Sequence, residues 1–305
     1  MMTSVRHAIT PKDLNLGLGI GWRPELALVI DRHPTLGFVE VIAEDFDPEG
    51  PIPAPIERLR ERGVVIVPHG LSLSLAGAER PDRARLRALG KLAERMGAPL
   101  VSEHIAFVRA GGVESGHLLP PPRTREALNV LVANVLEAQE AFPVPLALEN
   151  ISTLVEWPHP EMSEAEFVSE LLERTGAWLL LDVANVYANA RNKVGEQSDD
   201  PAGFFDRLPL DRLAYVHVAG GVDRNGLYHD THTFPTPGPV LDLLEQLASR
   251  TRVPGALLER DDRFPSDSEL LTELDAIASA LARGRKRIDR ENSNRSIPPS
   301  FPIPR

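Results

Sequence analysis

The feature that most constrains the fold is an alternation of short apolar runs with longer segments of helical periodicity, repeated along nearly the whole chain. The apolar runs, which are typical of β-strands, cover residues 16–20, 38–42, 64–69, 100–104, 146–149, 178–182, 213–217 and 256–259. Helices are expected over about 23–32, 54–62, 80–96, 123–141, 163–175, 239–250 and 268–281, with Ser163 and Glu166 forming a capping box. Eight near-regular β-α units favour a single (β/α)8 TIM barrel over a doubly wound open sheet.

The end of the chain differs in composition from the rest. Residues 284–305 begin with Gly284-Arg285-Lys286-Arg287 and finish rich in proline, a composition that cannot bury much apolar area. We therefore expect one α/β barrel domain over residues 14–283 and a basic, proline-containing, disordered tail over residues 284–305.

Charge and residue usage limit the classes of function. The formal net charge of −11 argues against a non-specific nucleic-acid binder. No apolar run reaches the length of a membrane span, and the N-terminus has no signal-peptide core, so we expect a cytoplasmic protein without a membrane partner. The chain has no cysteine, which leaves carboxylates and imidazoles as the metal ligands.

Polar side chains recur where the predicted strands end. They are Glu40, His69, His104, Glu149 with Asn150, Asp182, His217 and Glu259. The carboxyl ends of all strands of a barrel meet at one mouth, so these side chains should gather there. Asp230 and His232, in a Gly-rich loop after the seventh strand, add another carboxylate and imidazole. Such a cluster would hold unpaired or repelling groups without a cation, so the sequence predicts a metal site.

Each of these residues also has an ordinary structural interpretation. Glu149 and Asn150 are compatible with a hydrogen-bonded loop pair, and Asp182 with a cap on the following turn. Glu259 belongs to a charged run that solvent could cover. Their joint position at the strand ends is what favours the metal site over these alternatives.

A set of ordered motifs carries a family resemblance. They are Gly17-Leu-Gly-Ile-Gly-Trp-Arg-Pro24, His69-Gly-Leu-Ser-Leu-Ser74, Val101-Ser-Glu-His104, Leu148-Glu-Asn150, Leu179-Leu-Leu-Asp-Val-Ala-Asn-Val-Tyr187, Val216-His-Val-Ala-Gly220, Asp230-Thr-His232 and Leu258-Glu-Arg-Asp-Asp262. From about Leu14 to Leu281 the chain resembles the multinuclear non-heme iron-dependent oxidative enzymes, the family of the methanobactin-biosynthesis oxidase.

The resemblance implies a TIM barrel with two or three irons that cycle between Fe2+ and Fe3+, bound in three groups of ligands, the first two of which share Glu149. The groups are His69, His104 and Glu149; then Glu149, Asp182, His217 and Glu259; then Asn185, Asp230 and His232. Of these, Glu149, Asp182 and His217 are the catalytic candidates.

The activity implied is O2-dependent oxidation of a residue in a ribosomally synthesised peptide, as in natural product biosynthesis. Cysteine is the first candidate residue and Asp or Asn the second, and a small partner protein would deliver the peptide. We also expect Glu103, Asn150 and Asp261 to orient the ligating imidazoles.

Two other classes of function stay open. The same ligand pattern resembles endonuclease-IV-like and xylose-isomerase-like proteins, which would use Zn or Mn for hydrolysis or isomerisation. Asn185 disfavours the nuclease, which typically has a histidine three residues after the carboxylate of the sixth strand. A non-catalytic peptide-binding scaffold would keep the barrel without needing the metal ligands.

Overall fold

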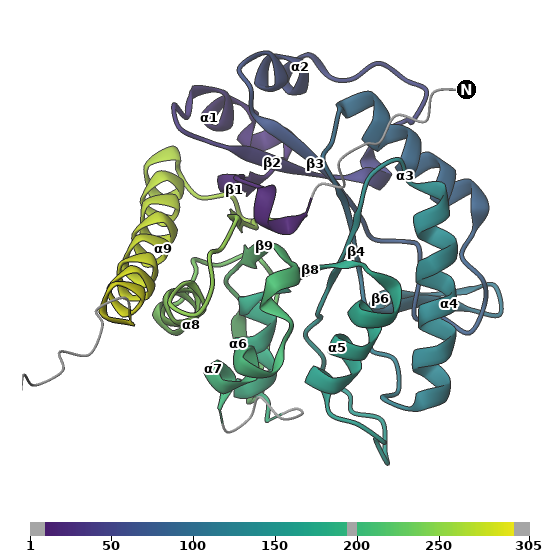
Figure 1. Cartoon of the computed structure of the whole chain (residues 1–305). Helices are drawn as coiled ribbons and strands as arrows, with labels where there is room; N and C mark the ends of the chain where they lie inside the picture. The colour runs from purple at the N-terminus through teal and green to yellow at the C-terminus, as the bar shows by residue number, and fades with distance from the viewer. Residues whose placement is uncertain (1–9, 194–199, 296–305) are drawn as a thin grey trace, which may run out of the picture.

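Eight parallel strands close into a barrel in the described part of the chain. The structure, a computed structural model, describes residues 10–193 and 200–295. Around the barrel the strand order is β1-β12-β9-β8-β7-β4-β3-β2, so the first strand pairs with the last (Figure 1). The strands are β1 (Gly17–Gly21), β2 (Phe38–Ile42), β3 (Val65–Gly70), β4 (Val101–His104), β7 (Leu146–Glu149), β8 (Trp178–Asp182), β9 (Leu213–Val218) and β12 (Gly255–Leu258). The predicted (β/α)8 barrel is confirmed.

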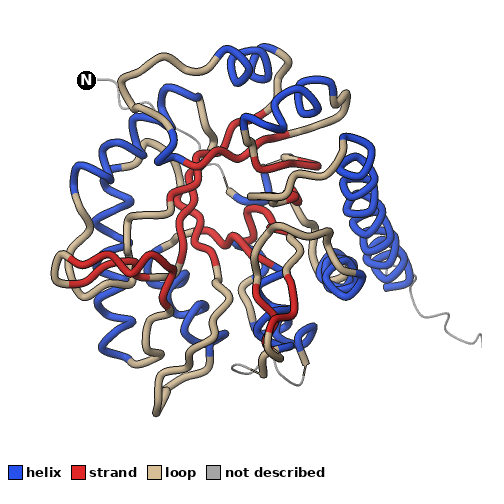
Figure 2. The backbone as a smooth tube through the Cα atoms, turned by 180° about the vertical axis from the view of Figure 1, so that it is seen from behind, coloured by secondary structure: helices blue, strands red, loops and turns tan. Residues whose placement is uncertain are grey.

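Helices form an outer ring around the strands (Figure 2). They are α1 (Ala27–Arg32), α2 (Ala54–Glu61), α3 (Arg83–Met96), α4 (Arg125–Ala141), α5 (Glu164–Thr175), α6 (Val183–Arg191), α7 (Pro201–Phe204), α8 (Gly238–Ala248) and α9 (Asp267–Arg295). The capping box at α5 forms as predicted, because Ser163 and Glu166 each accept the other's backbone amide. No helix among the described residues combines the length and apolar character needed to cross a bilayer.

The interior of the barrel has an apolar floor below a polar mouth. The floor is one buried cluster of Leu14, Leu16, Phe38, Val67, Leu100, Ala147, Trp178, Leu180, Ala214, Tyr215 and Leu257. Alternate residues of a strand share a face, so the position two residues after a floor residue also points inward. Glu40 follows Phe38 in this way, and His69 follows Val67. The register that buries the floor therefore also directs the strand-end polar groups into the mouth.

Gly19 of β1 makes room for the largest ring of this floor. A Cβ atom at this position would lie 2.3 Å from Cε1 of Phe38, far inside van der Waals contact. The Phe38 ring in turn packs edge-on against Tyr215, with ring centroids 5.7 Å apart. The interior below the mouth is therefore filled with side chains.

Helix α9 corrects the predicted start of the tail at residue 284. The helix continues past the predicted end at Leu281 and reaches Arg295, beside α8 (Figure 1). Arg283 and Arg287 form ion pairs with Glu245 of α8. Basic side chains on both sides of the predicted boundary at residue 284 thus have a partner on the barrel domain. Residues 296–305 lie outside the described residues.

Two antiparallel hairpins extend the loops at the carboxyl ends of β4 and β9. They consist of β5 (Phe107–Ala110) with β6 (Val113–Leu119) and of β10 (Val222–Arg224) with β11 (Leu227–His229). Asn225 and Gly226, between β10 and β11, both have positive φ angles, as a tight two-residue hairpin turn requires. The predicted Gly-rich loop is thus partly ordered as a hairpin, and Asp230 and His232 follow it.

Candidate metal centre

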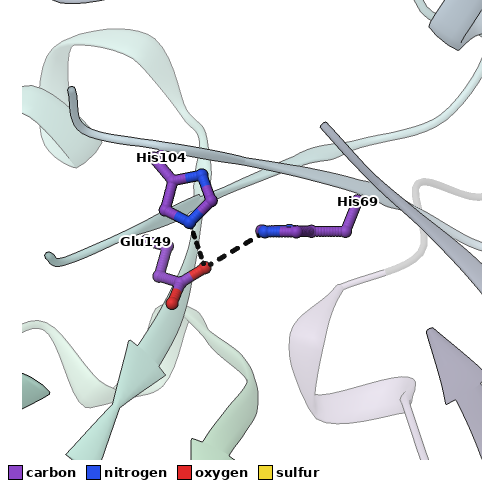
Figure 3. Close-up of side chains that lie close together, drawn as sticks. All are labelled: His69, His104 and Glu149. Atoms are coloured by element: carbon purple, nitrogen blue, oxygen red, sulfur yellow. Dashed lines mark ion pairs between the residues drawn. The ribbon is translucent and has the colours of Figure 1, made fainter. Parts of the chain in front are cut away.

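Three neighbouring strands, β3, β4 and β7, bring together a first ligand group of His69, His104 and Glu149. Nε2 of His69 lies 3.6 Å and Nε2 of His104 lies 3.4 Å from the same oxygen, Oε2 of Glu149 (Figure 3). All three side chains are buried. Two imidazoles therefore converge on one carboxylate oxygen, as the sequence-based grouping predicts.

The other oxygen of Glu149 faces a second ligand group. Oε1 of Glu149 lies 3.2 Å from Nδ1 of His217, and Oε2 of Glu259 lies 3.3 Å from the same nitrogen. Asp182 has a ligand atom within 4.8 Å of those of Glu149 and His217. Glu149 thus presents one oxygen to each of two groups, the arrangement expected of a bridging carboxylate.

A third ligand group contains Asp182, Asp230 and His232, whose ligand atoms lie within 4.8 Å of one another. Asp182, rather than Asn185 alone, connects this group to the second one. The Nδ2 atom of Asn185 donates to the carbonyl of Asn150 at 3.0 Å, while its buried Oδ1 has no hydrogen-bond partner. The ligand role of Asn185 stays a prediction.

Asn150 does not orient an imidazole, contrary to expectation. Its side chain donates to the carbonyl of Asp182 at 3.1 Å and accepts from the amide of the same residue at 2.9 Å. It therefore holds the backbone at the end of β8, so its contribution to the site passes through the position of Asp182.

Two other carboxylates contact imidazoles, as expected from the sequence. Oε1 of Glu103 lies 3.3 Å from Nδ1 of His104, on the opposite side of the ring from Glu149. Oδ2 of Asp261 lies 2.9 Å from Nδ1 of His232, and Asp261 also accepts from Arg23. Each contact can fix the orientation of its ring.

Buried polar atoms without partners indicate what the cluster can bind. Among the described residues they include Oε2 of Glu149, Oδ2 of Asp182, Oδ1 of Asn185, Nδ1 of His217 and Oδ1 of Asp230. Each such atom costs about 1–3 kcal/mol if it stays unpaired. Two ligand atoms that share an ion at about 2.1 Å lie about 3.0–3.4 Å apart, close to the separations of 3.2, 3.4 and 3.6 Å around Glu149. Imidazole and carboxylate donors suit iron, zinc or manganese, so the residues fit a divalent metal.

The cluster also shifts pKa values, because charges of both signs are buried together. Burial by itself would lower the pKa of His104, but the carboxylates of Glu149 and Glu103 outweigh it and raise this pKa to about 9. Burial raises the pKa of Asp182 to about 8, and the carboxylates of Asp230 and Glu149 add to the effect. At neutral pH both groups hold protons that a bound cation would displace.

The sequence-based ligand assignment left out Glu40 and the interior residues near it. Oε2 of Glu40 lies 3.0 Å from Nε2 of His217, and Tyr215 and Ser102 connect Glu40 to His69. Glu40 was expected at a strand end but lies in the middle of β2, and its inward-facing position two residues after Phe38 was the available signal. Nothing in the sequence pairs it with Tyr215, which is 175 residues away.

Comparisons with known proteins show the family of this chain. The family model described as "RiPP precursor modification enzyme MbnB/TglH/ChrH" matches residues 17–282. A UPF0276 protein of Streptomyces avermitilis is 54% identical over 279 residues, covering 89% of this chain and 56% of that protein. The chain thus spans little more than half of that relative's length. A UPF0276 protein of Caulobacter vibrioides is 38% identical over 273 residues, covering 88% of this chain and 96% of that protein.

Solved structures share the barrel at low sequence identity. D-Psicose 3-epimerase from Clostridium cellulolyticum aligns with a TM-score of 0.57 at 13% identity, covering 89% of this chain and 99% of the other. Endonuclease IV from Thermus thermophilus aligns with a TM-score of 0.56 at 19% identity, covering 87% and 99%. These likenesses show the fold alone. The match over residues 17–282 shows more: the chain belongs to the MbnB/TglH/ChrH family of RiPP precursor modification enzymes.

Proposed function

We propose that this chain is a multinuclear non-heme iron-dependent oxidase that uses O2 to modify a residue of a ribosomally synthesised peptide. Cysteine is the first candidate residue, and Asp or Asn is the second. The observation that carries the proposal is the position of Glu149, which presents one oxygen to the histidines of the first group and the other to the second. In a family of peptide-modifying enzymes, this arrangement favours chemistry at two adjacent metal ions.

Each proposed metal ion has its own set of ligands. His69 and His104 would bind one ion with Glu149, while the second would take Asp182, His217 and Glu259. A third ion would be held by Asp230 and His232 with Asn185. Iron bound in this way would supply reversible Fe2+/Fe3+ chemistry with O2.

The barrel keeps these candidate ligands buried and close together. Glu259 is 9% exposed and His217 is fully buried, so little water competes for the second group. Below them the apolar floor, with Leu180 and Leu257, closes the barrel interior. A substrate residue can therefore approach only from the mouth, where the loops at the carboxyl ends of the strands lie.

Exposed apolar residues near the mouth suit a peptide substrate. In the loop between β7 and α5, Leu154 is 50%, Val155 is 56% and Trp157 is 43% exposed. Nε1 of Trp157 donates to the carbonyl of Pro120 at 2.7 Å, which ties this loop to the end of β6. Exposed apolar side chains grouped in one loop are typical of sites that bind other chains. A small partner protein that presents the peptide would dock on the same side.

The test is metal analysis of anaerobically purified protein, followed by Mössbauer spectroscopy and O2 uptake with its peptide. A fully loaded protein should contain iron, show a mixed-valent signal and consume O2 only when the peptide is present. Protein without iron, or iron-loaded protein that consumes no O2 with its peptide, would contradict the oxidase.

Other outcomes would select the other classes. Stoichiometric zinc or manganese with turnover in the absence of O2 would indicate a hydrolase or isomerase. Unchanged function after His104→Ala would indicate a binding scaffold, because a metal enzyme needs this ligand.

A further inference from the structure

A continuous hydrogen-bonded path runs through the barrel interior just below the candidate metal centre. The hydroxyl of Tyr215 contacts Oε2 of Glu40 and lies 2.7 Å from Oγ of Ser102. Oγ of Ser102 lies 2.8 Å from Nδ1 of His69. All four side chains are nearly or fully buried, with exposures of 4% or less. The path therefore connects β2, β9, β4 and β3 without solvent.

The direction of each hydrogen bond follows from the number of protons available. A carboxylate accepts only, so Tyr215 must donate its single hydroxyl proton to Glu40. The Tyr215 oxygen then accepts the hydroxyl proton of Ser102, and the Ser102 oxygen accepts Nδ1–H of His69. This order leaves the lone pair of His69 on Nε2, the nitrogen that faces Glu149 at 3.6 Å.

Glu40 acts on a second imidazole through the same oxygen. Oε2 of Glu40 lies 3.0 Å from Nε2 of His217, which places the proton of that ring on Nε2. The lone pair of His217 is then on Nδ1, which has no hydrogen-bond partner. This nitrogen faces Glu149 at 3.2 Å and Glu259 at 3.3 Å.

We propose that Glu40 is a positioning residue that selects opposite ring nitrogens in two ligand groups. His69 would bind its metal through Nε2 and His217 through Nδ1. Oε2 of Glu40 accepts Nε2–H of His217 directly, and it fixes Nδ1–H of His69 indirectly, through the hydrogen bonds of Tyr215 and Ser102. This inference rests on the proposed function only in requiring that a metal binds here, not in requiring oxidation. Glu40 is then a partner of two ligands and not a ligand itself.

The primary test is a crystal structure of the wild-type protein loaded with Zn2+, a redox-inert probe. We expect Zn2+ on Nε2 of His69 and on Nδ1 of His217, with Glu40 hydrogen-bonded to Nε2 of His217. Coordination of His217 through Nε2, or of Zn2+ by Glu40, would overturn the inference. Failure of Zn2+ to bind would overturn both this inference and the metal centre. If Zn2+ binds through the expected nitrogens but the iron-loaded protein never consumes O2, the inference stands and only the proposed oxidase activity is refuted.

Variants separate the two branches of the path. Zn2+ affinity, measured by competition with a chromogenic chelator, should fall about 10–100-fold in Glu40→Ala. Glu40→Gln keeps an oxygen that can accept both hydrogen bonds, so it should recover most of this affinity. Tyr215→Phe should weaken only the ion at His69, since the contact of Glu40 with His217 does not pass through Tyr215.

A matched control removes a hydroxyl outside the path. Tyr187 on α6 packs edge-on against Tyr228, with ring centroids 5.1 Å apart, and its Tyr187→Phe variant should bind Zn2+ like the wild type. Equal affinities for Glu40→Ala and the wild type would overturn the inference. So would equal losses in Glu40→Ala and Glu40→Gln in proteins with wild-type thermal stability, because shared hydrogen bonding would then play no part.

Discussion

Replacing Glu149 with glutamine tests whether one carboxylate connects two metal ions. The carboxylate of Glu149 lies close to three imidazole nitrogens. Its Oε1 is 3.2 Å from Nδ1 of His217, and its Oε2 is 3.4 Å from Nε2 of His104 and 3.6 Å from Nε2 of His69. Burial would raise the pKa of Glu149, but His217 and His104 outweigh it and lower the pKa, so the group is ionised at neutral pH. Glu149→Gln keeps the volume and removes the negative charge. It should weaken both the first and the second ligand group at once.

The contacts of Glu149 give a lower bound for the expected loss of metal affinity. Removal of a residue that only orients a ligand already costs about 10–100-fold in metal affinity. Glu149 contacts the ligand atoms directly, so each of the two ions should bind at least about 100-fold more weakly, or about 2.8 kcal/mol. The assay is Fe2+ affinity by anaerobic chelator competition, together with iron content after desalting.

A buried glutamate away from the mouth provides the control. Glu245 on α8 is 7% exposed and pairs with Arg283 and Arg287, so Glu245→Gln should change stability but not iron affinity. The reasoning is refuted if folded Glu149→Gln binds iron with wild-type affinity and stoichiometry. Loss of a single ion with the other unchanged would refute the bridge specifically.

Three further outcomes are expected. Combining Asp230→Asn with His232→Gln should release one ion and leave those at Glu149 bound; metal analysis showing a fully empty protein would contradict this. Because the pKa values of His104 and Asp182, about 9 and about 8, are raised above their unfolded values, the folded metal-free protein binds more protons. Its melting temperature should fall as pH rises from about 7 to 9, while Zn2+ affinity rises over the same window as those protons leave; flat calorimetric and titration profiles would refute the charge assignment. Gly37→Ala should destabilise the barrel by several kcal/mol in chemical denaturation, since its Cβ would lie 1.9 Å from the carbonyl oxygen of Leu16; wild-type stability would contradict the packing.

The barrel could be predicted because its strands are buried on both faces and therefore appear as continuous apolar runs. The hairpins had no such signal: Val113 in β6 is 70% exposed, so no hydrophobic pattern marks the strand. The end of α9 was missed for a different reason. Arg285, read as part of a basic tail, donates to the carbonyl of Val253 at 3.0 Å. A sequence shows the charge but not the acceptor that the fold brings to it.

The site was predictable to the extent that the barrel determines it. Strand-end position alone predicted that His69, His104 and His217 would lie close together, because the carboxyl ends of all strands of a barrel meet at one mouth. The choice between ring nitrogens was not predictable, since it depends on Glu40 and on contacts between strands distant in sequence. Sequence position therefore predicts which side chains gather at the mouth, and only the packed interior gives the orientation of their rings.

Asp182 shows why the structural and functional interpretations of a residue need not compete. Its Oδ1 accepts from the amides of Ala184 at 2.6 Å and Asn185 at 3.0 Å, which caps α6. Its Oδ2 is buried without a hydrogen-bond partner and belongs to the second and third ligand groups. The cap fixes the carboxylate plane and thereby aims the free oxygen at the cluster. Asp182→Asn would keep a capping oxygen but turn the other atom into a donor, so helix α6 should persist while the metal affinity of both groups falls.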